Sequence, residues 1–155
     1  MIHNGTHRRP ALLLLLLAGL LTTVSAACGG SKQNTAATTA STSLRQSSEA
    51  GNVTVDVTWK GRAAGLVFTV AMDTHSVDLD SYDLRTLAVL RTDQGTEAQP
   101  TSWDAAKGGH HREGTLTFPA TTADGKPLLA PETRSFALTI RGIAGVPERT
   151  FRWTL

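Results

Sequence analysis

NVTVDVTWK, residues 52–60, alternates without a break between apolar and polar side chains. Successive side chains of an extended chain point to opposite faces. One face therefore carries only apolar residues, namely Val53, Val55, Val57 and Trp59. A period of two in a run of β-branched residues predicts a β-strand that is buried on one face and open to water on the other.

The same alternation returns along the rest of the chain. Further strands are predicted at residues 66–72 (LVFTVAM), 84–91 (LRTLAVLR), 114–118 (GTLTF), 134–142 (RSFALTIRG) and 149–155 (RTFRWTL), with a seventh near 101–103. Turn residues separate them, as in GRAAG and ADGKP. Short strands joined by turns predict an all-β fold, an immunoglobulin-like antiparallel β-sandwich of about seven strands over residues 51–155. Six aromatic side chains are expected to form its core: Trp59, Phe68, Phe118, Phe136, Phe151 and Trp153.

The N-terminus has the layout of a secretory signal peptide. A polar segment that ends in Arg8 and Arg9 precedes the apolar run of residues 11–21, and small residues follow. A membrane-spanning helix needs about 20 apolar residues, and this run is shorter. Residues 1–27 are therefore interpreted as a targeting signal outside the folded domain.

The signal ends in VSAACGGS, which resembles the bacterial lipobox, where small residues precede a cysteine that becomes lipidated. Cys28 is the only cysteine of the chain and stands where the lipobox requires it, although Ser25 occupies a position that usually holds leucine. The resemblance implies a lipoprotein anchored through Cys28 on the extracytoplasmic side of the membrane, in the cell envelope. Ordinary cleavage after Ala26 is the alternative, and it would give a secreted protein.

Residues 28–50 contain mostly Gly, Ala, Ser, Thr, Gln and Asn. Such a segment buries too little apolar surface to offset the entropy of ordering, so the sequence predicts a disordered linker behind the lipidated cysteine. Removing Arg8 and Arg9 with the signal reduces the 15 basic residues to 13, equal to the 13 acidic ones. A neutral mature chain does not indicate nucleic-acid binding. One cysteine excludes an intramolecular disulfide.

A metal site is one hypothesis for the remaining histidines. Asp73 and His75 of MDTHSV are two residues apart and would share a face, and His110 and His111 lie together in GGHHREG. MDTHSV weakly resembles the Asp-x-His element of copper-binding β-sandwich proteins of the copper-resistance C type. That resemblance implies Cu(II) ligation by Asp73 and His75. The family's N-terminal histidine has no counterpart here, and His110 or His111 could replace it in a site for Cu(II) or Zn(II).

The alternative reading of GGHHREG is a polar loop whose histidines bind nothing. In the same way, DLDSYDL offers Asp78, Asp80 and Asp83 to calcium, but their spacing does not match an EF-hand, and a cap or a solvated loop is the usual role of such residues.

Catalysis is not indicated, because the chain has no GxSxG, HExxH or phosphate-binding glycine loop. DTHSVDL, GGHHREG and PERTFRW together resemble a group of uncharacterised bacterial envelope proteins, a resemblance that implies no established activity. The sequence therefore predicts a non-catalytic binding or structural module whose partner is another envelope protein. The alternative is a lipoprotein that binds or handles Cu(II) or Zn(II) through Asp73, His75, His110 and His111.

Overall fold

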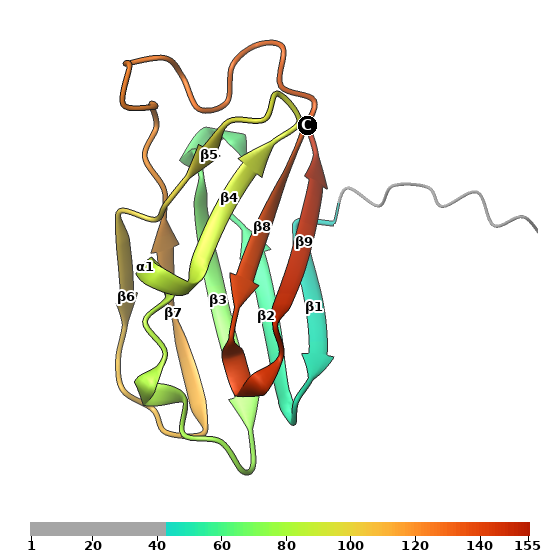
Figure 1. Ribbon diagram of the computed structural model, residues 1–155, viewed down its shortest axis with the longest axis vertical. Helices are drawn as coiled ribbons and strands as arrows, with labels where there is room; N and C mark the ends of the chain where they lie inside the picture. The colour runs from blue at the N-terminus through green and yellow to red at the C-terminus, as the bar shows by residue number, and fades with distance from the viewer. Residues whose placement is uncertain (1–42) are drawn as a thin grey trace, which may run out of the picture. The chain divides into compact units, whose positions relative to one another are not determined.

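The computed structural model describes residues 43–155, which form two antiparallel β-sheets on either side of one core (Figure 1). The five-stranded sheet has the order β1-β2-β3-β7-β6, and the four-stranded sheet has the order β5-β4-β8-β9. The strands are β1 (Arg45–Ala50), β2 (Val53–Trp59), β3 (Val67–Thr74), β4 (Ala88–Thr92), β5 (Glu97–Ala98), β6 (Ser102–Ala105), β7 (His111–Thr117), β8 (Ser135–Arg141) and β9 (Glu148–Thr154).

The predicted all-β sandwich is confirmed, with nine strands in place of about seven in the described part of the chain. The strands expected from residues 52–60, 66–72, 114–118, 134–142 and 149–155 all form, and the one near 101–103 becomes β6. The predicted signal peptide, residues 1–27, lies outside the described residues, as do Cys28 and most of the predicted linker.

The core contains the side chains that the alternation assigned to it. Val53, Val55 and Val57 of β2 are fully buried, and all six predicted aromatic side chains are at most 5% exposed. Phe68 lies among the rings of Phe118, Phe136 and Trp153, at centroid distances of 5.8, 6.1 and 5.3 Å. Because rings from both sheets interlock there, this cluster fixes the distance between the two layers.

Strand β1 corrects the expected domain boundary, because the ordered sheet begins at Arg45 and not at residue 51. β1 pairs with β2 from Arg45↔Thr58 to Ala50↔Val53. Apart from Ala50 its residues are polar, and none is buried, so hydrophobic periodicity gave no sign of it. Backbone pairing and polar contacts hold it instead. Arg45 pairs with Asp56 of β2 (2.9 Å), and the Gln46 amide accepts from the backbone N–H of Arg152 (3.1 Å) and donates to its carbonyl.

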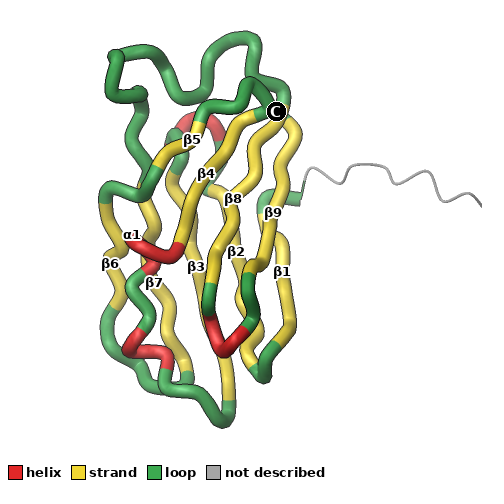
Figure 2. The backbone as a smooth tube through the Cα atoms, viewed as in Figure 1, coloured by secondary structure: helices red, strands yellow, loops and turns green. Residues whose placement is uncertain are grey.

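The single strand expected over residues 84–91 is wrong in its first half, where one helical turn, α1 (Leu84–Leu87), leads into β4. The Asp83 side chain accepts a hydrogen bond from the backbone N–H of Arg85 (3.0 Å) and so caps this turn. Three further helical turns are η1 (Arg62–Ala64), η2 (Leu79–Ser81) and η3 (Ile143–Gly145) (Figure 2).

A buried arginine closes one end of the sandwich. Arg149 is 3% exposed and donates to the carbonyls of Ile143 (3.1 Å) and Ala50 (2.7 Å), and burial lowers its pKa. It thereby joins the β8–β9 loop to the β1–β2 turn.

Gly51 lets the β1–β2 turn approach the β8–β9 loop closely. A Cβ at Gly51 would lie 2.6 Å from the carbonyl oxygen of Ala144, so only glycine allows this close approach.

Candidate functional site

An open cleft of about 420 Å³ lies where the segment from η2 to α1 covers β6 and β7. We call it the Trp103 cleft. Polar and charged side chains dominate its lining, which consists of Asp80, Ser81, Tyr82, Asp83, Arg85, Thr101, Ser102, Trp103 and Arg112. Its size is in the range of protein ligand sites.

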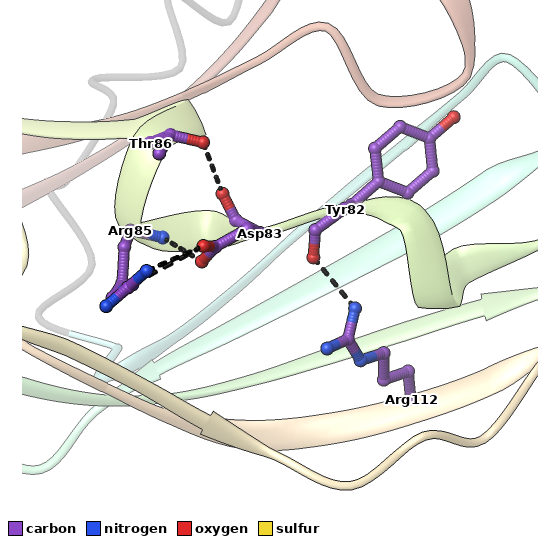
Figure 3. Close-up of polar contacts among 5 residues, drawn as sticks. All are labelled: Tyr82, Asp83, Arg85, Thr86 and Arg112. Atoms are coloured by element: carbon purple, nitrogen blue, oxygen red, sulfur yellow. Dashed lines mark hydrogen bonds and ion pairs between the residues drawn. The ribbon is translucent and has the colours of Figure 1, made fainter.

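Arg112 holds the two walls of the cleft together. It lies on β7, and its Nη1 donates to the carbonyls of Leu79 (2.8 Å) and Tyr82 (2.7 Å), the second of which Figure 3 shows. Its Nε donates to the carbonyl of Ala106 (3.3 Å). The guanidinium carbon lies 5.7 Å from the ring centroid of Trp103, within the range of a cation–π contact. One side chain thus fixes the η2 loop, the end of β6 and the indole.

Asp80 fastens the glycine turn of GGHHREG to the cleft. Its Oδ1 accepts from the backbone N–H groups of Gly108 (2.9 Å) and Gly109 (3.3 Å). The bond from Gly108 is the main cause that lowers the pKa of Asp80. The backbone N–H of Leu79 donates to the carbonyl of Gly109 (2.9 Å), so two contacts join the same two loops.

Asp83 and Arg85 form the exposed rim of the cleft, and Figure 3 shows the contacts between them. The Asp83 Oδ2 accepts from Arg85 Nη2 at 3.2 Å, and their side chains are 45% and 58% exposed. The backbone hydrogen bond from Arg85 is the main cause that lowers the pKa of Asp83. Thr86 Oγ1 donates to the Asp83 carbonyl (2.9 Å) and completes the capped turn.

Two of the four predicted metal ligands meet. Asp73 on β3 faces His111 on β7 in the strand register, and Asp73 Oδ1 lies 2.6 Å from His111 Nδ1. His75, which follows β3, and His110, in the turn before β7, are exposed. Among residues 43–155, no three side chains of His, Cys, Asp or Glu come together in a way that could hold a metal ion.

The glycines of GGHHREG serve a tight turn. A Cβ at Gly108 would lie 1.9 Å from the carbonyl oxygen of His111, so no other residue fits there without a shift of the backbone. His110 contributes its carbonyl, which accepts from the N–H of Thr74 (3.0 Å). The arrangement favours the polar-loop reading for His110, while His111 is paired with Asp73.

The aspartates of DLDSYDL act as caps. Asp78 accepts from the N–H of Asp80 (3.0 Å), Asp80 holds the glycine turn, and Asp83 caps α1. Each carboxylate is therefore occupied by backbone N–H groups, which agrees with the turn-cap reading rather than with the calcium alternative.

Trp103 and Arg112 were not predicted as site residues from the sequence. Leu116 and Phe118 of the GTLTF run are buried, and counting back in steps of two from them reaches position 112. The sequence therefore places Arg112 on the inward face of a strand. A charge on that face needs hydrogen-bond partners, and this could have indicated a site. The indole N–H of Trp103 is buried and has no hydrogen-bond partner in the described part of the chain.

Between residues 43 and 155, every helix is too short or too polar to cross a bilayer. Protein-family models, curated proteins and solved structures offer no match to this chain.

Proposed function

We propose that this protein is an extracytoplasmic lipoprotein, anchored through Cys28, whose β-sandwich is a non-catalytic binding module for another envelope protein. The Trp103 cleft is its binding surface. The observation that carries the proposal is the construction of this cleft, which is open to solvent although its walls are fixed by backbone hydrogen bonds.

Fixed walls favour recognition, because a preorganised surface loses little conformational entropy when a partner binds. The Nη1 and Nε groups of Arg112 donate hydrogen bonds within the domain, while the rim pair Asp83 and Arg85 is exposed to solvent. Arginine and tryptophan are also the residues most often found at the energetic centre of protein interfaces. Trp103 and Arg112 are therefore the expected anchors, and Asp83 and Arg85 the polar rim.

Site-specific photo-crosslinking in cells tests the binding surface. A photoreactive residue at Ser102, in β6 on the rim of the cleft, is expected to capture a protein partner. The matched control is Ser47 in β1, an equally exposed serine on the opposite edge strand of the same sheet. Adducts of equal yield at both positions, or none at Ser102, would remove the cleft as the binding surface.

The anchor is tested in the same cells by Cys28→Ala, which leaves no thiol for lipidation. We expect the variant to leave the membrane fraction while the crosslink at Ser102 weakens, because the domain is diluted away from its partner. Unchanged membrane association would contradict the anchor. The binding surface would still be tested by the crosslinks at Ser102.

Metal handling is the second candidate, and the contact between Asp73 and His111 is the observation that favours it. We rank it below the binding module because only two of the four proposed ligands meet, whereas Cu(II) and Zn(II) sites use three or four. If metal handling is right, the purified protein binds Cu(II) stoichiometrically in a titration. His111→Ala then abolishes Cu(II) binding, while His110→Ala does not. Equal binding by both variants would exclude the Asp73–His111 site.

A further inference from the structure

A second hollow, of about 330 Å³, lies on the outer face of the four-stranded sheet. Its centre is Ala137 on β8, which faces Arg91 of β4 on one side and Arg152 of β9 on the other. The small side chain of Ala137 leaves the space between the two longer ones open. We call this the Ala137 hollow.

The two arginines can reach the same point above Ala137. Neighbouring strands are about 4.8 Å apart, so the backbones of Arg91 and Arg152 are separated by about 10 Å. Both side chains are on the solvent face, because their neighbours Leu90 and Trp153 are buried. In the adjacent row, Ser135 faces Thr154, and both residues line the same hollow.

The charges around the hollow leave one guanidinium free. Arg91 lies 3.5 Å from Glu97, and Arg141 of the same face lies 4.0 Å from Glu148. Arg152 has no ion-pair partner anywhere in residues 43–155. Among the described residues that line the hollow, Asp93 is the one carboxylate, and its Oδ2 accepts from the backbone N–H of Arg134 (2.9 Å).

We propose that the Ala137 hollow binds a phosphate group, with Arg91 and Arg152 as its main ligands and Ser135 and Thr154 as hydroxyl donors. A tetrahedral phosphate has oxygens on all sides and can accept from two arginines that approach from opposite directions. A planar carboxylate is already satisfied by the fork of one arginine. This site lies on the other sheet from the Trp103 cleft and does not depend on the function proposed for that cleft.

Titration of the full chain with glycerol phosphate at constant ionic strength, followed calorimetrically, tests the site. We expect saturable binding that Arg152→Gln and Arg91→Gln each weaken by about tenfold or more, since each removes charge-assisted hydrogen bonds. The matched control is Arg141→Gln, which removes the same charge from the same face outside the hollow. Ala137→Glu should abolish binding, because its carboxylate would occupy both arginines.

A second experiment, with lipid vesicles, distinguishes a lipid headgroup from a free phosphate group as the ligand. Binding to phosphatidylglycerol vesicles but not to glycerol phosphate, lost in Arg152→Gln and kept in Arg141→Gln, would assign the hollow to a lipid headgroup. Binding of the soluble ester would assign it to a free phosphate group. The proposal fails if neither binds, if Arg141→Gln weakens binding as much as Arg152→Gln, or if acetate at the same concentration binds as tightly.

Discussion

At the scale of single residues, polar side chains that satisfy backbone groups shape this domain. Arg112, Asp80 and Arg149 each join two loops, and each does so through backbone carbonyls or N–H groups. A buried backbone group without a partner costs about 1–3 kcal/mol, so removal of the Arg149 side chain, whose contact with the Ile143 carbonyl is buried, is costly beyond its own contacts. The loops around the Trp103 cleft therefore depend on a small number of side chains.

Acid should loosen the Trp103 cleft before it unfolds the sandwich. The pKa values of Asp80 and Asp83 lie below the ordinary 3.8 in the folded protein, chiefly because of backbone hydrogen bonds from Gly108 and Arg85. The unfolded chain then binds more protons. The stability that these carboxylates contribute is complete above pH 3.8 and is lost as the pH falls through their folded pKa values.

Asp80→Asn tests this, because its amide oxygen can still accept from the N–H of Gly108 but the side chain no longer titrates. We expect the urea-unfolding free energy of the variant to fall less between pH 7 and pH 3 than that of the wild type. Asp104→Asn is the control, since the Asp104 side chain accepts no hydrogen bond from any residue between 43 and 155. An unchanged slope in Asp80→Asn would refute the role of Asp80.

Sequence reasoning reached some site residues and missed others for a physical reason. It named Asp73, His111 and the three loop aspartates, because their chemistry is visible in the residue types. Which of them meet depends on the register of β3 against β7, a long-range pairing that local periodicity does not contain. Arg112 was missed because the carbonyls that it binds, those of Leu79 and Tyr82, are far away in the sequence, and Trp103 was missed because its contact is the Arg112 guanidinium.

At the scale of elements, alternation identifies strands that bury one face and fails for strands that do not. β2 and β8 were predicted because every second residue is apolar, and β9 because Phe151, Trp153 and Leu155 alternate with polar residues. The sequence of β1 is typical of a linker, since the order of this strand comes from backbone pairing and from polar contacts such as those of Gln46 with Arg152 and of Arg149 with Ala50. α1 was hidden because Leu84 and Leu87 extend the apolar run of β4, and only the cap at Asp83 marks the helical turn.

Gln46→Ala should weaken the attachment of β1 to β9. The variant loses two hydrogen bonds to the backbone of Arg152, and we expect a loss of about 1 kcal/mol in the free energy of unfolding. Hydrogen exchange should show faster exchange of the Arg152 amide, which the glutamine protects. Ser47→Ala, one residue further along the same strand, is the control and should leave that amide unchanged. If Arg152 exchanges equally in all three proteins, the Gln46 amide does not close this edge.

At the scale of the whole molecule, the fold class follows from the sequence, but the order of the strands does not. Turn residues and alternation predict a sandwich, because many short strands with one apolar face can be buried only against each other. Strand β3 pairs with β7 instead of β4, and the chain changes sheets three times, between β3 and β4, between β5 and β6 and between β7 and β8. These choices are long-range pairings, such as that of Phe68 with Leu116, which the alternation along a single strand does not contain.

The strand order also decides how far the point where the chain enters the domain lies from the Trp103 cleft. The chain enters the five-stranded sheet at β1, one margin of the sheet, and β6 beside the Trp103 cleft forms the other margin (Figure 1). Four strand spacings separate these margins, about 19 Å. A membrane tether attached ahead of β1 would therefore hold the domain at the edge strand opposite the Trp103 cleft. A protein that docks at the cleft would then not collide with the attachment point.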